Sequence, residues 1–355
     1  CPGIPQTVSD SAVHPGGTAA DGVYQTKGES MKKQYYFATW IRVAATVSIL
    51  LCHFLIQSEN GLLNMSAQFF NIGVDLFIIL SGFLFGVRQG ETADVRAWYG
   101  KRLKRVFILY EIFVIMLFIV HAVCGQDLLD EDWIWLVLGL QGSAVGVPGA
   151  EQTWFITPLL ICYAITPLLD RFFSGTRKPG QLKCALLAAA ASPLLWVVPK
   201  TPAVSTLLSL VSWYVVAFAV GRYSGKVRLT KGRAVAALFI MVMAFAVRLA
   251  ARHFCDGTIL YERLVCSYTH IIAAFCIFYI FAVVFEKIQP VWVIRKASAI
   301  SFEVYLFHYM FCVGPVRLFD VTPCWITDCV LVTLVTVALA VAVHALSEKI
   351  IKSMR

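Results

Sequence analysis

The sequence is poor in charged residues and lacks the usual motifs that hold a metal or a nucleotide. Only 14% of its 355 residues are charged, whereas a soluble domain has about a quarter, so a soluble globular domain is excluded. The 11 cysteines form no CxxC pair and no Cys/His ligand spacing, so no metal site is expected. A glycine-rich phosphate loop is also missing, and so is any repeat of solenoid period.

The sequence is rich in long apolar runs. Hydrophobic residues make up 59% of the chain, and ten runs approach the roughly 20 residues that a helix needs to cross a bilayer. We therefore predict an all-α fold, a polytopic membrane helical bundle of about ten transmembrane helices. The runs lie at residues 41–57, 69–87, 106–124, 153–169, 182–199, 204–221, 234–250, 264–285, 298–316 and 326–346.

An eleventh apolar run, residues 133–147, is short and rich in glycine. If it does not cross the membrane, nearly all basic residues gather on one side and the acidic segment 127–132 lies on the other. The positive-inside rule then places both termini in the cytoplasm, and the short run becomes a re-entrant or interfacial helix. The net charge of +9 is thus explained by topology and by contact with anionic lipids, and nucleic acid is not an expected partner.

Residues 1–30 differ from the rest of the chain. They are polar, rich in Gly, Ser and Thr, and contain no apolar segment of the kind found in signal peptides. We expect residues 1–30 to be a disordered or artefactual tail and residues 31–355 to form a single membrane domain.

The first apolar run carries two ionisable residues, Arg42 and His53, with a spacing that places them on one helical face. Eleven residues correspond to about 20° beyond three full turns and to roughly 16 Å along the axis. Alone, Arg42 could be an interfacial anchor, and His53 could be a buried histidine bonded to a helix carbonyl. Because ionisable groups inside a membrane are costly, a shared face makes both residues candidates for a functional site.

His53 is the candidate general base, because a neutral imidazole can take a proton from a hydroxyl group. Asp75, in the second run, is expected at a similar depth in the outer half of the membrane. There its carboxylate would hold the other ring nitrogen of His53, fixing the tautomer as in a catalytic triad. An unpaired carboxylate at that depth would be expensive, which is a second reason to expect a partner for Asp75.

A basic segment follows the second run and contains Arg102 and Arg105. These two residues lie at positions i and i+3 of a helical face, where their guanidinium groups could clamp a phosphate. The alternative is a cluster that contacts the headgroups of the inner leaflet. A clamp at this place suits a cytosolic ligand with a charged phosphate end and a long neutral arm.

Two later segments contain candidate substrate-binding residues. Ser301, Tyr305 and His308 form a polar stripe on one face of the run 298–316, either as contacts between helices or as the wall of a site. Trp154 begins another run, where an interfacial aromatic residue is the ordinary interpretation.

These elements, in this order, resemble the acyltransferase type 3 family of integral-membrane acyltransferases. Arg42-x10-His53 resembles the first-helix signature of that family, and NIGVDLFIILSGFLFG, which carries Asp75, resembles its second helix. Arg102-x-x-Arg105 is similar to the RxxR pair of its cytoplasmic loop. TWFITP, around Trp154, and ISFEVYLFH, with Tyr305 and His308, resemble its later motifs.

The resemblance implies that the chain transfers an acyl group, most often acetyl, from a cytosolic coenzyme A thioester to an exported or surface carbohydrate. Acetyl-CoA or another acyl-CoA would bind through Arg42, Arg102 and Arg105, and His53 with Asp75 would carry the chemistry. Trp154, Tyr305 and His308 would contact substrate, and no metal would take part.

The expected setting is a multi-pass protein of a cell membrane, a bacterial plasma membrane in particular. Its partners would be membrane lipids, a carbohydrate or glycolipid acceptor, and a separate protein of a polysaccharide-assembly pathway. Two other interpretations stay open: a transporter or flippase for a small or lipid-linked substrate, and a scaffold for polysaccharide assembly. Consumption of a thioester would separate the enzyme from both.

Overall fold

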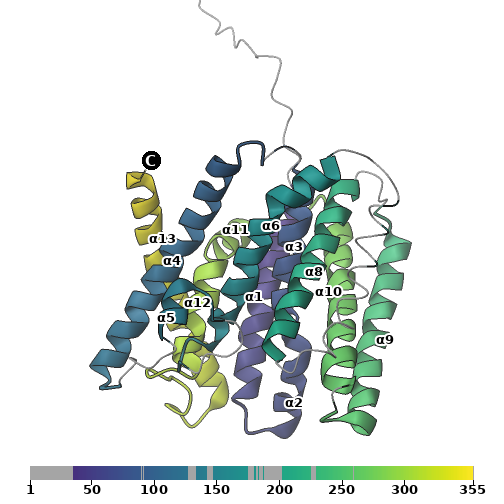
Figure 1. The fold of residues 1–355 in the computed structure, drawn as a ribbon. Helices are drawn as coiled ribbons and strands as arrows, with labels where there is room; N and C mark the ends of the chain where they lie inside the picture. The colour runs from purple at the N-terminus through teal and green to yellow at the C-terminus, as the bar shows by residue number, and fades with distance from the viewer. Residues whose placement is uncertain are drawn as a thin grey trace, which may run out of the picture. The chain divides into compact units, whose positions relative to one another are not determined.

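A computed structural model describes residues 35–88, 90, 92–126, 133–141, 147–174, 202–224, 229–258 and 260–354, and the single positions 180, 183 and 187. The chain divides into Cys1–Gln34, which lies outside the described residues, and a compact unit, Tyr35–Arg355. The described part of this unit contains helices and no strand (Figure 1). An all-α fold is thus confirmed, whereas the prediction for residues 1–30 stays a prediction.

The helices follow one another as α1 (Tyr36–Ile56), α2 (Gly61–Phe70), α3 (Gly73–Val87), α4 (Val95–Val123), α5 (Trp133–Leu138), η1 (Glu151–Phe155), α6 (Ile156–Ser174), α8 (Pro202–Tyr223), α9 (Lys231–Cys255), η4 (Leu260–Val265), α10 (Cys266–Val284), α11 (Trp292–Ala299), α12 (Ser301–Cys312) and α13 (Trp325–Ser353).

Eight helical segments of the described chain are long and apolar enough to cross a membrane, so the chain is a multi-pass membrane protein. The predicted count of about ten is not confirmed. The predicted run 182–199 lies almost entirely outside the described residues. The run 298–316 forms α12, whose 12 residues span only roughly 18 Å, and α11 precedes it as a separate short helix.

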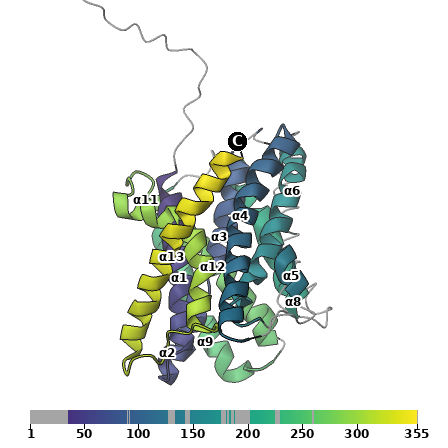
Figure 2. The same cartoon turned by 90° about the vertical axis from the view of Figure 1, so that its left-hand side faces the viewer.

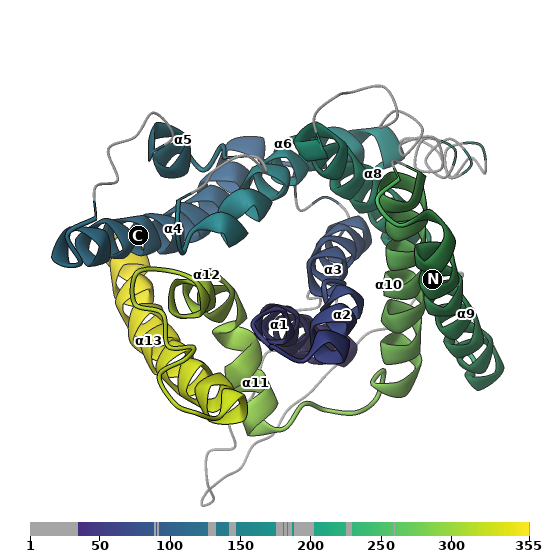
Figure 3. The same ribbon diagram turned by 90° about the horizontal axis from the view of Figure 1, so that it is seen from below.

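Helices α1, α2 and α3 lie in the middle of the bundle, with the other long helices around them (Figure 3). The helix α3 packs against α8 at very short range. A Cβ atom added to Gly82 would meet the Tyr214 carbonyl, and one added to Gly86 would meet the Phe218 carbonyl. Small residues allow such close backbone approach, which is a common way for helices to associate within a membrane.

The second apolar run is a broken helix, which the sequence did not predict. The helix α2 ends at Phe70, and α3 begins at Gly73 after a two-residue turn. Gly73 then packs against α1, where a Cβ atom would meet the Ala45 carbonyl and lie 2.6 Å from the side chain of Ile49. This contact sets the depth of every later residue of α3 relative to α1.

The segment between α4 and η1 starts and finishes at the same end of the bundle. His121, in the last turn of α4, bonds through Nε2 to the Pro148 carbonyl oxygen at 3.0 Å, just before η1 begins. Within this segment α5 has six residues, or roughly 9 Å of helix. The chain therefore returns to the end that it left, as the interpretation of residues 133–147 as a non-crossing run requires.

The first residues of α4 lie beside the last residues of α13 (Figure 2). Lys104 Nζ donates to the Met354 carbonyl oxygen at 3.4 Å, and Arg105 Nη2 lies 3.8 Å from Glu348 Oε1. Arg42, near the start of α1, lines the same cavity as Arg105. We call this end of the bundle, where α1 begins and α13 ends, the basic end.

Candidate functional site

A cavity of about 580 Å³ extends into the bundle from the basic end. Its walls come from α1, α3, α4, α6, α11 and α12, so it is formed by segments far apart in the sequence. Five arginines contribute to its lining, and they are Arg42, Arg88, Arg102, Arg105 and Arg295. Three of them, Arg88, Arg105 and Arg295, are exposed, which marks the mouth of the cavity.

Arg42, Arg102 and Arg105, which were predicted to act together, line one cavity although 60 residues separate the first from the second. The Arg102 guanidinium lies over the Phe85 ring, 4.9 Å from its centre. Arg88 and Arg295 were expected only as charges of cytoplasmic loops. Each follows or precedes an apolar run, and that position gives no sign that the side chain turns into a cavity.

The cavity is strongly positive. The charges of Arg88 and Arg105 act directly on Arg42, which means that like charges are held close together in a partly dry space. The one carboxylate in the described lining, Glu303, already binds His344 Nδ1 through its Oε1 at 2.5 Å. Repulsion of this kind is relieved when a multiply charged anion binds, and bidentate arginine contacts to phosphate are strong.

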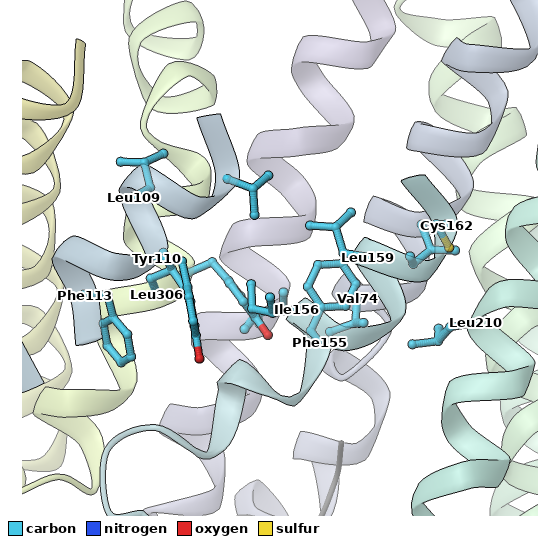
Figure 4. Packing of buried hydrophobic residues seen from close by; sticks show 14 of the residues in the cluster. Val74, Leu109, Tyr110, Phe113, Phe155, Ile156, Leu159, Cys162, Leu210 and Leu306 are labelled. Carbon is cyan, nitrogen blue, oxygen red and sulfur yellow. The ribbon is translucent and has the colours of Figure 1, made fainter. Parts of the chain in front are cut away.

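Apolar residues and Tyr305 also contribute to the cavity lining. Leu109, Phe155 and Leu159 are among the apolar residues and belong to the buried core around α4 and α6 (Figure 4). The Tyr305 hydroxyl donates to the Gln152 carbonyl oxygen, which ties α12 to η1. A ligand with an anionic head and a long, mostly neutral arm would match the charged and the apolar residues of this lining.

One helical turn beyond Tyr305, two histidines from different helices pack together. The His53 ring, in the last turn of α1, lies 5.0 Å from the ring of His308, and its edge meets Tyr309 at 4.7 Å between ring centres. The ring of Tyr305 lies 6.1 Å from that of His308. His53 and His308, which were predicted separately, are therefore neighbours directly above the end of the cavity.

The hydrogen bonds of His308 fix its tautomer. Its Nδ1 lies 2.7 Å from the Tyr305 carbonyl oxygen and 3.2 Å from that of Val304, so Nδ1 carries the proton. In the neutral ring Nε2 then holds a lone pair, and this atom is buried without a partner among the described residues. His53 Nδ1 is also buried and unpartnered. Two orphaned nitrogens on adjacent rings are costly unless a ligand or a proton transfer uses them.

Asp75 is not brought to His53. Because Gly73 lies level with Ala45 and Ile49, Asp75 lies roughly 9–15 Å below His53 along the helix axes. The prediction of similar depth assumed one continuous helix, and the break before Gly73 removes that assumption. Asp75 instead lies in the first turn of α3, where the helix dipole favours a carboxylate, and within reach of the charge of Arg248.

Around Arg248 there is a second polar cluster, which includes Gln68 of α2 and His270 of α10. Arg248 is 6% exposed, and its Nε donates to Gln68 Oε1 at 3.2 Å. His270 Nε2 lies 2.8 Å from the Gln68 carbonyl oxygen. These contacts hold the end of the broken helix against α9 and α10. Trp154, by contrast, packs on Phe155 and is not part of the described cavity lining.

One of three comparisons with known proteins identifies the family of the chain. A family model described as an acyltransferase domain matches residues 35–345, which is nearly the whole described unit. No curated protein and no solved structure matches the chain.

Proposed function

Because this chain belongs to the acyltransferase type 3 family, and is therefore an acyltransferase of groups other than amino-acyl groups, we propose that it moves an acetyl or another acyl group from a coenzyme A thioester to a hydroxyl group of a carbohydrate. The observation that carries the proposal is the cavity at the basic end, with five arginines at one end and two histidines beyond the other.

The phosphates, the pantetheine arm and the thioester of acyl-CoA can each be matched to one group of residues in the cavity lining. Its 3′-phosphate and diphosphate would bind among the arginines, where each charge-assisted contact contributes about 1.5–3 kcal/mol. Its pantetheine arm would follow the apolar wall past Leu109 and Phe155. The thioester would then reach Tyr305, one turn below His308.

The chemistry assigned to His53 is general-base catalysis. The acceptor hydroxyl gives its proton to His53 while its oxygen attacks the thioester carbonyl, and the carbon–sulfur bond breaks. The coenzyme A thiolate then takes the proton from His53. His308 Nε2, with its lone pair toward the reaction centre, stabilises the imidazolium that forms on His53. A short-lived acyl-histidine on His53 is the alternative course of the same transfer.

Asp75 has a positioning role in the proposed function and is not a direct partner of His53. It lies two residues after Gly73, which packs against α1, and the charge of Arg248 on α9 acts on its carboxylate. We propose that Asp75 helps to fix the position of α3, which carries the cavity residues Phe77 and Ser81.

The proposed orientation in the membrane follows from the position of the basic residues at one end of the bundle. The positive-inside rule places the basic end in the cytosol, where acyl-CoA is made, and the His53 end toward the opposite membrane face, where an exported carbohydrate would arrive. Both ends of the described unit would then face the cytosol of, we propose, a bacterium. A separate protein of polysaccharide assembly would deliver the acceptor.

Purified protein in detergent provides the test. We expect calorimetric binding of coenzyme A that weakens when the 3′-phosphate is removed, and release of free thiol from acetyl-CoA when an alcohol is added. Binding without any thiol release would favour a transporter. Mass spectrometry of envelope glycans from cells with and without the protein would then identify the acylated sugar.

A further inference from the structure

We propose that Glu151 and Tyr309 form the acceptor-binding site, and that this site selects an uncharged acceptor carrying two neighbouring hydroxyl groups. The inference rests on the proposed function, because it assumes that an acyl group reaches His53 from the donor cavity. It adds the residues that hold the acceptor and the chemical class that they accept.

The segment before and within η1 runs antiparallel along α12, and this packing places Glu151. A Cβ atom on Gly149, which has φ +86°, would lie 3.0 Å from Gly314 Cα and 3.3 Å from Met310 Cα. Further along, Gln152 Nε2 donates to the Leu306 carbonyl oxygen at 2.6 Å. Glu151 lies between these two anchors.

Tyr309 connects this segment to the histidine pair. Gly149 and Gln152, on either side of Glu151, contact α12 at Met310 and Leu306, on either side of Tyr309. The Tyr309 ring packs against His53 with 4.7 Å between ring centres, and the negative charge of Glu151 acts on the Tyr309 hydroxyl. Tyr305, which lines the donor cavity, lies one helical turn before Tyr309 on the same face of α12. An acceptor held by Glu151 and Tyr309 would therefore reach His53 from about one helical turn beyond the thioester.

Both side chains have polar atoms available to a ligand. The Glu151 carboxylate accepts from the backbone amides of Gly149, at 2.9 Å to Oε2, of Ala150 and of Glu151 itself, while no described side chain donates to it. The Tyr309 hydroxyl makes no hydrogen bond to any described residue. Both residues are half-buried, and neither carries a fully buried orphan atom, so solvent reaches these oxygens.

The carboxylate of Glu151 and the aromatic ring of Tyr309 together determine which class of acceptor can bind. A carboxylate can accept hydrogen bonds from two adjacent hydroxyl groups, and the face of an aromatic ring beside it suits the apolar face of a sugar ring. An anionic acceptor would be repelled by Glu151. One hydroxyl of the bound diol would point to His53, while its neighbour would stay on the carboxylate.

Three small acceptors of similar shape test the proposal: cis-cyclohexane-1,2-diol, cyclohexanol and cyclohexylamine, each with saturating acetyl-CoA. Thiol release should show a higher kcat/KM for the diol than for cyclohexanol. Glu151→Gln should lower kcat/KM for the diol about tenfold more than for cyclohexanol, through KM, because one charge-assisted hydrogen bond is weakened. Glu151→Asp should restore part of the difference, and Tyr309→Phe should reduce it.

The exposed Glu262, on η4, provides a matched control: Glu262→Gln should keep the wild-type preference. Unchanged binding of coenzyme A shows that each variant is folded. The inference would be wrong if Glu151→Gln lowered kcat/KM equally for the diol and for cyclohexanol, or if the wild-type protein preferred cyclohexylamine. Either result would leave the proposed binding of acyl-CoA in the cavity unaffected. Absence of thiol release from the wild-type protein with every acceptor would refute the proposed function, and the inference with it.

Discussion

Arg42→Gln should weaken coenzyme A binding without harming the unliganded protein. The Arg42 side chain lines the donor cavity and forms no ion pair with any described residue, while the charges of Arg88 and Arg105 act on it. Without a ligand, Arg42 is a cation held among cations. Its removal should therefore leave the apo protein equally stable or slightly more stable.

The loss in affinity can be worked out from the same contacts. A hydrogen bond to a charged group contributes about 1.5–3 kcal/mol, which corresponds to roughly 10–150-fold in Kd. The substitution also removes repulsion from the unliganded state that binding would have relieved, so this effect does not offset the loss. We therefore expect Kd to rise by about 10–150-fold.

Isothermal calorimetry with coenzyme A measures the affinity, and thermal unfolding with and without coenzyme A measures both stabilities. Arg96→Gln is the matched control, because Arg96 is exposed on the same helix as Arg102 but is not part of the cavity lining. A lower apo melting temperature together with an unchanged Kd would mean that Arg42 is structural, and the assignment of the donor cavity would fail.

Three other variants separate binding from folding. The double variant Arg102→Ala/Arg105→Ala should bind coenzyme A more weakly and with a smaller salt dependence, measured by titration at several ionic strengths; unchanged binding would reduce the pair to lipid contacts. Asp170→Ala should lower the free energy of unfolding by about 3–5 kcal/mol, because it leaves the buried Arg222 guanidinium, 4% exposed, without its carboxylate; a thermal shift below 1 °C would contradict this. Gly86→Ala should destabilise the protein, because the added methyl group meets the α8 backbone; a wild-type melting temperature would show that the two helices can separate at no cost.

The helical class and the shared face of Arg42 and His53 could be predicted from the sequence, because both follow from local patterns. Apolar runs of sufficient length predict membrane helices, and the spacing from Arg42 to His53 places both on one face whatever surrounds them. The pairing of His53 with His308 could not be predicted, because 255 positions separate the two residues and no local signal relates their helices.

The depth of Asp75 could not be predicted for a different reason. The run 69–87 keeps a high mean hydropathy although it contains Asn71 and Asp75, so hydropathy alone gives no sign of the break before Gly73 that shifts α3 against α1. In the same way, Glu151 could be placed near a span end, but its position beside Tyr309 depends on the close packing of Gly149 against α12.

The substitution His53→Ala tests the central claim most directly. Arg42, one of the arginines that would hold the phosphates, lies roughly 16 Å below His53 along α1, so the affinity for coenzyme A should stay within about twofold of wild type. Thiol release in the presence of an acceptor should fall by a factor of about 10²–10⁴, the usual contribution of a general base. Retention of more than a few per cent of the wild-type rate, with binding intact, would show that the catalytic base lies elsewhere, with His308 the next residue to replace.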